Sequence, residues 1–317
     1  MFRFVSSRNS VKLKKAYLAQ YNVRLLQSKL DNLMANYPDI KAILPDDVTA
    51  KNLLVGNFKY LVKVYIAYTC YLHEKTSEER SIICNAFKKG GFNYESHKSK
   101  ISNFLMNIDN GFEIHNCVYC DLEDVTTFTK ADGSRVRKFE TEHVLDKGEC
   151  PLVALSLYNF VPSCRTCNSS DIKGSKTLGD TASEIVKLSP SAEGYDFDGK
   201  VRFEIKTITP GAPDLNIISH PDDYEIDFNV TDKIYRKSID FFELKSRYNS
   251  GNNKIELLKW RDKRRHNPDN IIRQFAEIKK TTFEDVFEEM FELNLRKLQH
   301  YPMEKARREI IMEGDLR

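Results

Sequence analysis

Long hydrophobic runs are missing from this sequence of 317 residues. No stretch approaches the roughly 18 apolar residues that a membrane-spanning helix needs, so we expect no membrane partner. The N-terminus carries no apolar leader with a cleavage site, and the chain has no Walker-type glycine-rich loop. Hydrophobic residues still make up 41% of the chain and aromatic residues 11%, enough for a sizeable core. These features predict a globular protein without an ATPase site of its own.

A large excess of one charge is also lacking, because 49 basic residues face 46 acidic ones and the net charge is only +3. Such a balance says little about a nucleic-acid partner. The first 30 residues, however, contain no acid, and their basic residues would suit phosphate binding or, equally, a solvated basic helix face. These basic residues are Arg3, Arg8, Lys12, Lys14, Lys15, Arg24 and Lys29.

Cysteine is sparse, with seven residues, but four of them form two C-x2-C pairs. Each pair lets two thiolates from one tight turn reach the same ion, so the two pairs predict a closed, tetrahedral, structural zinc site. Disulfides, or buried thiols without partners, are the alternatives. The odd number of cysteines left over fits a reducing cytoplasm, where we expect the protein to reside. The pairs are Cys117 with Cys120 and Cys164 with Cys167; the others are Cys70, Cys84 and Cys150.

Polar residues with catalytic potential lie between and just after these pairs. Residues 139–143 alternate in character and predict a strand ending at His143. Residues 159–164 predict a second short strand that begins at Asn159, and residues 168–173 can open a helix. Strand, loop, strand and helix would bring His143, Asn159 and Asn168 to one face. Taken singly, a histidine at a strand end or an asparagine in a turn is more often structural.

In this order, the motifs resemble those of the HNH endonucleases, the ββα-metal superfamily, many of which carry two such cysteine pairs. The resemblance implies that His143 is the general base, as its near-neutral titration would suit. It implies that Asn159 orients the His143 ring, and that Glu142 and Asn168 offer oxygens to one Mg2+ or Mn2+ ion. Lys173 would hold a flanking phosphate, with Arg165 as a second candidate.

The sequence departs from the HNH pattern at two positions. Glu142 stands where aspartate is common, and Asn168 stands where some members have histidine. An amide oxygen suits a hard ion such as Mg2+ better than zinc, so the second departure favours magnesium. If Glu142 does not reach the ion, Asp146 or Glu140 would be the substitute.

The resemblance also implies substrate and biological context. We expect a DNA endonuclease, with RNA less favoured as substrate, which leaves 5′-phosphate and 3′-hydroxyl ends. The run from Pro151 to Gly174 is similar to HNH proteins of bacterial anti-phage defence, and the Septu type suggests a regulatory ATPase as partner. Restriction or homing enzymes are another HNH context. Cutting both strands would need a homo-oligomer or repeated events. The alternative from another functional class is a non-catalytic, zinc-braced nucleic-acid-binding protein.

The expected fold class is α+β. A central ββα-metal HNH module with structural zinc, over residues 111–178, is flanked by a helical N-terminal region, residues 1–110, and by residues 179–317. The first region begins with a helix predicted over residues 7–36. The last contains two alternating segments, 201–208 and 224–230, that are expected to pair as strands before further helices.

Overall fold

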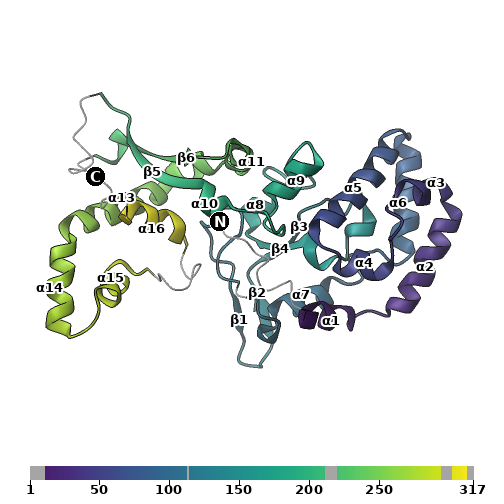
Figure 1. The fold of residues 1–317 in the computed structure, drawn as a ribbon, viewed down its shortest axis with the longest axis horizontal. Coiled ribbons are helices and arrows are strands. Elements are labelled where there is room, and N and C mark those ends of the chain that lie inside the picture. The colour runs from purple at the N-terminus through teal and green to yellow at the C-terminus, as the bar shows by residue number, and fades with distance from the viewer. Residues whose placement is uncertain (1–10, 113, 211–219, 294–301, 313–317) are drawn as a thin grey trace. The chain divides into compact units, whose positions relative to one another are not determined.

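The fold is described from a computed structural model, which covers residues 11–112, 114–210, 220–293 and 302–312. Over these residues, helices alternate with three two-stranded antiparallel sheets (Figure 1). The strands are short and the helices dominate, so the expected α+β class is confirmed at this level.

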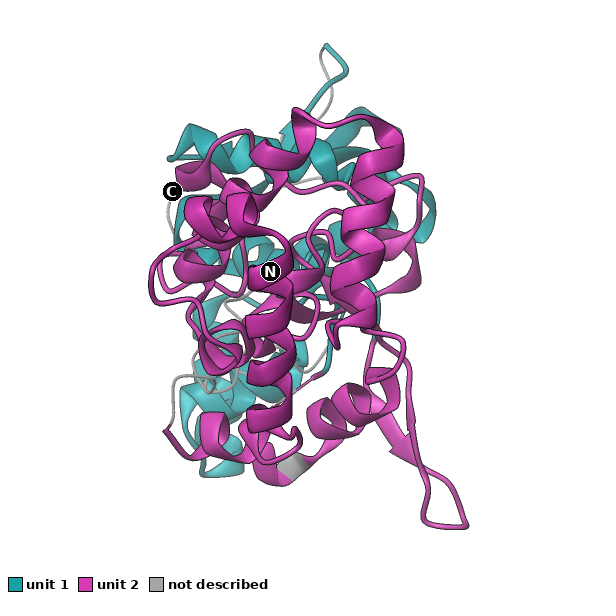
Figure 2. Cartoon of the chain, turned by 90° about the vertical axis from the view of Figure 1, so that its right-hand side faces the viewer, with its two compact units in different colours: residues 1–2, 115–124, 197–317 teal, residues 3–114, 125–196 magenta. Residues whose placement is uncertain are grey.

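The chain divides into two compact units, which are drawn in different colours in Figure 2. Unit 1 comprises Met1–Phe2, His115–Asp124 and Phe197–Arg317. Unit 2 comprises Arg3–Ile114 and Val125–Asp196. The predicted regions 1–110, 111–178 and 179–317 are consecutive segments of the sequence, whereas each compact unit combines separate segments. That division stays a prediction.

Unit 2 begins with helices that pack around buried aromatic and aliphatic side chains, among them Tyr17, Leu61, Tyr68 and Phe87. Side-chain caps mark several of their starts, and Thr76 forms a full capping box that satisfies free backbone groups of α6. The helices are α1 (Val11–Leu18), α2 (Val23–Asn36), α3 (Pro38–Ile43), α4 (Ala50–Val55), α5 (Phe58–His73), α6 (Ser77–Lys89) and α7 (Lys98–Met106), followed by the 3-10 turn η1 (Ile108–Asn110).

The helix predicted over residues 7–36 is two helices where the structure describes it. The chain leaves α1 after Leu18 and enters α2 at Val23. Asn22 explains the break, because its side-chain oxygen accepts the N–H of Leu25 and caps α2. The apolar periodicity continues through the break, so it could not reveal the cap. Residues 7–10 lie outside the described part of the chain.

The rest of unit 2 contains two hairpins and short helices. Strand β1 (Thr127–Thr129) pairs with β2 (Arg135–Arg137), and β3 (Glu140–His143) pairs with β4 (Phe160–Ser163). In the second pair Glu142 lies opposite Val161 and His143 lies opposite Phe160. The remaining elements are η2 (Pro151–Val153), η3 (Leu157–Asn159), α8 (Arg165–Asn168) and α9 (Ala182–Leu188). Helix α8 lies against β3.

Unit 1 contains the third sheet. After the short helix α10 (Phe197–Lys200), β5 (Val201–Thr207) pairs with β6 (Tyr224–Val230), the latter entered through η4 (Pro221–Asp223). Alternate residues of both strands are buried, as a sheet with one face against a core requires. The predicted pairing of segments 201–208 and 224–230 is therefore confirmed.

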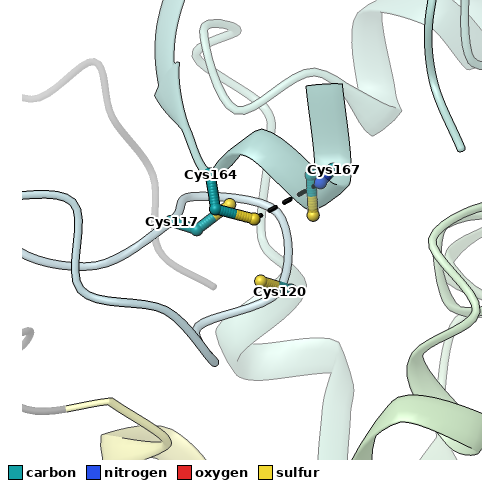
Figure 3. Close-up of side chains that lie close together, drawn as sticks. All are labelled: Cys117, Cys120, Cys164 and Cys167. Atoms are coloured by element: carbon teal, nitrogen blue, oxygen red, sulfur yellow. Dashed lines mark hydrogen bonds between the residues drawn. The ribbon is translucent and has the colours of Figure 1, made fainter. Parts of the chain in front are cut away.

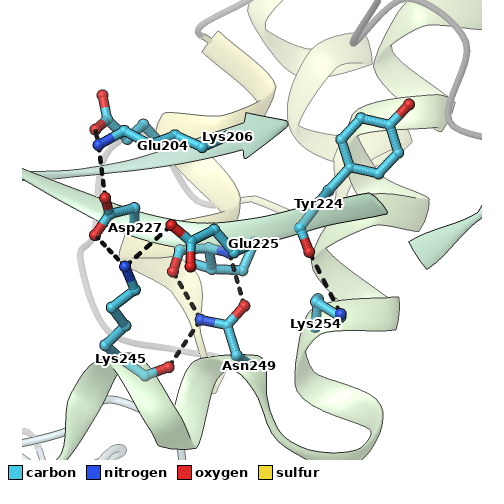
Figure 4. Close-up of polar contacts among 9 residues, drawn as sticks. Glu204, Lys206, Tyr224, Glu225, Asp227, Lys245, Asn249 and Lys254 are labelled. Atoms are coloured by element: carbon cyan, nitrogen blue, oxygen red, sulfur yellow. Dashed lines mark hydrogen bonds and ion pairs between the residues drawn. The ribbon is translucent and has the colours of Figure 1, made fainter. Parts of the chain in front are cut away.

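Polar side chains of unit 1 gather on and beside this sheet (Figure 4). Lys206 pairs with Asp227 at 2.6 Å across the strands, and Lys245 pairs with Glu225 at 3.0 Å. The Asn249 side chain accepts the N–H of Ile226 at 2.8 Å and donates to its carbonyl at 2.7 Å.

The sheet of unit 1 is followed by helices, as predicted. They are η5 (Lys233–Tyr235), α11 (Arg236–Phe241), α12 (Leu244–Asn249), α13 (Gly251–His266), α14 (Asp269–Lys279), α15 (Phe283–Phe291) and α16 (Glu304–Met312). Ile272, Phe287, Phe291 and Ile311 are central to a buried apolar cluster of these helices.

Candidate functional site

The first cysteine pair lies in a tight turn. The N–H of Asp121 donates to the Cys117 carbonyl at 2.9 Å, and Asp121 itself adopts a left-handed backbone with φ of 59°. Its buried carboxylate accepts the side-chain N–H of Asn116 at 3.0 Å and the backbone N–H of Lys305 at 3.1 Å. The N–H of Leu122 points at the sulfur of Cys120, 3.5 Å away. Hydrogen bonds from Asn116 and Lys305 to Asp121 thus hold the turn, and the sulfurs of Cys117 and Cys120 lie within 4.8 Å of each other.

The second pair begins helix α8. Cys164 is the N-cap residue, and its sulfur accepts the N–H of Cys167 at 3.3 Å. A thiolate is a better acceptor than a thiol, so this contact favours the deprotonated form that binds metals.

The sulfurs of Cys117, Cys120, Cys164 and Cys167 all lie within 4.8 Å of one another and are buried (Figure 3). Tetrahedral zinc with Zn–S bonds of about 2.3 Å requires sulfur separations of about 3.8 Å, so only small adjustments separate this arrangement from a zinc site. No disulfide joins the cysteines in the described part of the chain. The cluster is arranged to bind a structural metal such as zinc, as predicted. Four protein ligands leave no open position for substrate.

Glu142 and His143 end strand β3, as predicted, and their side chains are only 5% exposed. The Glu142 carboxylate forms a buried ion pair with Lys173, with Nζ 2.5 Å from Oε1. The same ammonium donates to the carbonyl oxygen of His143 at 2.8 Å. Burial raises the pKa of Glu142, while the positive charge of Lys173 opposes the rise. Lys173 is therefore directed inward to these two neighbours, and its predicted role as a phosphate ligand stays a prediction.

Among the described residues, the His143 ring has one polar neighbour, the carbonyl oxygen of Ala154, 3.1 Å from Nε2. A carbonyl can only accept, so Nε2 carries the hydrogen and Nδ1 has the free lone pair. Burial depresses the pKa of His143 well below its usual range, and the charge of Lys147 adds to this effect. The ring is consequently neutral at physiological pH, with Nδ1 as the nitrogen that carries the lone pair.

Asn159 is fully buried at the end of η3, directly before β4. Its oxygen accepts the N–H of Leu145 at 2.7 Å, and its nitrogen donates to the carbonyls of Leu145 and Val153, each at 3.0 Å. These contacts close the loop that follows His143. Asn159 therefore acts on the backbone of that loop, whereas sequence reasoning assigned it directly to the histidine ring.

No family model matches the chain, and neither the curated proteins nor the solved structures contain a match. Among the described residues, none of the helices has both the length and the apolar character required to cross a membrane.

The other predicted residues are placed less centrally. Asn168 ends α8 and is half-buried, and Arg165 on the same helix is exposed. The carboxylate of Asp146, a proposed substitute for Glu142, accepts the N–H of Gly148 at 2.9 Å and belongs to the turn. Glu140 begins β3, three residues before the histidine.

Sequence reasoning missed one neighbour of the histidine. The Tyr94 ring meets the His143 ring edge to face, with centroids 4.5 Å apart, and Phe160 meets it from β4 at 4.9 Å. Lys147 lies over the Tyr94 ring at 4.7 Å. Tyr94 is distant in sequence from the motifs and has no distinctive spacing, so nothing in the sequence pattern pointed to it.

Proposed function

We propose that the chain is a metal-dependent endonuclease of the HNH type that hydrolyses phosphodiester bonds in DNA. The observation that carries the proposal is the orientation of the His143 ring at the end of β3, where Nε2 donates to the Ala154 carbonyl, so that Nδ1 is the nitrogen that would act as the base. The succession of β3, β4 and α8, with α8 against β3, supports it because this is the order expected of a ββα-metal module.

The residues around His143 suit the remaining parts of the reaction. Asn159 fixes the loop that follows the histidine, so the Ala154 carbonyl and the ring are held in one arrangement. Glu142 and Asn168 would hold a single Mg2+ or Mn2+ ion, because both offer oxygen ligands and α8 lies against β3. When bound, the ion would stabilise negative charge on the phosphate and the leaving oxygen. The four cysteines would hold structural zinc.

The wider context rests on the sequence resemblance. It extends the proposal to a role in bacterial anti-phage defence or restriction in the cytoplasm, with a regulatory ATPase as partner. One active site cuts one strand, so a double-strand break would come from a homo-oligomer or from successive cuts.

Cleavage of supercoiled plasmid by the purified, zinc-loaded protein with Mg2+ or Mn2+ tests the proposal. We expect nicking that EDTA abolishes and that His143→Ala reduces by about 100- to 10,000-fold, as removal of a general base does. His97→Ala is the matched control, since His97 lies outside this site and should leave cleavage unchanged. Equal cleavage by wild type and His143→Ala would overturn the assignment of the base.

A second candidate function is a zinc-braced nucleic-acid-binding protein without activity. It is favoured by the closure of the site, where Glu142 and His143 are 5% exposed and Lys173 is 2% exposed. A folded, zinc-loaded protein that retards DNA in a gel shift, but does not cut it with either metal ion, would support this function instead.

A further inference from the structure

A cavity of about 350 Å³ lies in the helical part of unit 2. It is bounded by the C-terminal half of α5, by one face of α6 and by residues 148–149. Its volume falls at the lower end of the range of about 300–1,000 Å³ that is typical of small-molecule sites. The residues of the proposed catalytic site do not line it, so its role can be considered independently of the nuclease.

The face of α6 toward the cavity carries two cations. Arg80, Cys84 and Lys88 all line the cavity, and their spacing of four residues places them in one row along the helix. The Cys84 thiol in the middle contacts the carbonyl oxygen of Glu149 at 3.7 Å, which joins α6 to the opposite wall. The Cα atoms of Arg80 and Lys88 are about 12 Å apart along the helix axis, and the flexible Lys88 side chain can extend over Cys84 toward Arg80.

Both cations lack a carboxylate partner within the described part of the chain. The Arg80 guanidinium donates from Nε to the Lys75 carbonyl at 3.0 Å and from Nη2 to the His73 carbonyl at 2.9 Å. These bonds fix its position without neutralising its charge. The Lys88 side chain forms neither a hydrogen bond nor an ion pair with any described residue, whereas its backbone carbonyl accepts the N–H of Gly91 at 3.2 Å. The cavity therefore presents one preorganised and one mobile positive group to an anion.

The opposite wall carries one acid. Glu149 is the only acidic residue among the described lining residues, and the Tyr65 hydroxyl donates a hydrogen bond to its carboxylate. Two permanent positive charges thus face one negative charge. Ser77, Ser81 and Asn85 add neutral hydrogen-bonding groups on α6. A matching ligand has an anionic group at one end and a hydrogen-bond donor at the other.

We propose that this cavity binds a small phosphate ester of nucleoside monophosphate size, with its phosphate on Arg80 and Lys88. The small volume of this partly open cavity favours a small molecule over a nucleic-acid strand, which would need an extended groove. Phosphate accepts hydrogen bonds from both cations, and an amino group of the ligand would face Glu149. The proposal holds whether or not the chain is a nuclease.

Calorimetric titration of the full chain with 5′-AMP, adenosine and inorganic phosphate tests the proposal. We expect 5′-AMP and phosphate to bind, and adenosine to bind about tenfold more weakly than 5′-AMP because it lacks the anion. Lys88→Gln should weaken 5′-AMP about tenfold, since it removes a charged hydrogen bond. Lys89→Gln is the matched control, because Lys89 is the next residue of α6, is exposed and does not line the cavity.

The Lys88 side chain makes no hydrogen bond or ion pair with the described residues, so its variant should fold, and a thermal melt checks this. Arg80→Gln provides a second variant with the same expected loss. Three results would overturn the proposal: no binding of 5′-AMP or phosphate at millimolar concentration, equal affinity for adenosine and 5′-AMP, or equal affinities of the Lys88→Gln and Lys89→Gln variants. Binding of a short single-stranded DNA alone, sensitive to Lys88→Gln, would assign the cavity to nucleic acid.

Discussion

The two buried clusters of reactive side chains, the four cysteines and the group of Glu142, His143 and Lys173, differ in where their positive charge comes from. The cysteine cluster offers sulfur ligands at metal-binding distance, and as thiolates these require a metal cation. The second cluster already contains a cation, because Lys173 lies 2.5 Å from the Glu142 carboxylate. The first should therefore depend on metal for its structure, whereas the second is closed without one and any metal ion there must compete with Lys173.

The largest expected effect comes from breaking the metal-dependent cluster. Cys164→Ser removes one sulfur ligand, while the serine oxygen can still accept the N-cap hydrogen bond of α8, so we expect loss of zinc and destabilisation by several kcal/mol from the lost metal. Elemental analysis and thermal unfolding would measure both. Cys70→Ser, at an exposed cysteine outside the cluster, should change neither. Retention of one zinc per chain with an unchanged Tm would show that the cysteines do not form a structural site.

The next effect tests whether the second cluster is neutralised internally. Lys173→Met leaves the Glu142 carboxylate buried without its ammonium, and removal of one partner of such a pair typically costs about 3–5 kcal/mol. Urea denaturation of the zinc-loaded protein would measure the free energy of unfolding. The double variant Glu142→Gln/Lys173→Met should recover most of the loss, because no unpaired charge remains.

Lys176→Met is the control for this experiment, since Lys176 is exposed and contacts only a backbone carbonyl at 3.2 Å. If Lys173→Met were no less stable than Lys176→Met, the Lys173 ammonium would not be needed to neutralise the buried Glu142 carboxylate. The proposed difference between this cluster and the metal-dependent cysteines would then be wrong.

A smaller effect is expected from Asn159, whose side chain holds the loop after His143 by hydrogen bonds to its backbone. Asn159→Ala removes three buried hydrogen bonds to the loop after His143, and we expect a loss of about 2 kcal/mol. Asn168→Ala, at a half-buried residue, should stay within about 0.5 kcal/mol of wild type while still impairing Mg2+-dependent cleavage. Chemical denaturation separates the two. Similar stability losses in the Asn159→Ala and Asn168→Ala variants would contradict the assignment of a structural role to Asn159 and a metal-binding role to Asn168.

The smallest effect concerns a histidine outside both clusters. Burial lowers the pKa of His97, and the charges of Lys100 and Lys29 contribute. The folded state therefore binds a proton less readily than the unfolded state, so stability contributed by neutral His97 is lost as pH falls below 6.5. Between pH 7.5 and 5.5, the Tm of His97→Gln should fall less than that of wild type, by on the order of 1 °C. An identical fall in both proteins would contradict this.

The parts of the structure that were predicted correctly depend on short-range patterns. The spacing of the cysteine pairs indicated a four-sulfur cluster, and alternation indicated β5 and β6. The strand ending at His143 was visible in the same way. The environment of the histidine was not predictable, because Tyr94 and the Ala154 carbonyl reach it through packing of segments that share no motif.

For two residues the structure shows contacts that the resemblance did not predict, while their expected roles stay predictions. The Asn159 side chain bonds the backbone at Leu145 and Val153. Lys173 is buried against Glu142. In both cases the motif identified a residue close to the histidine, while the direction of its side chain depended on which backbone groups needed a partner.

Asn249 and Lys254 give the small sheet of unit 1 a further property. The outward N–H and carbonyl of Ile226 in β6 are both taken by Asn249, and the Tyr224 carbonyl accepts Lys254 at 3.4 Å (Figure 4). An exposed strand edge is a template on which another chain can add a strand and begin aggregation. Here part of that template is occupied by side chains from the following helices, so a foreign strand would have to displace them. The β6 edge of the sheet is thereby partly protected from adding a strand of another molecule.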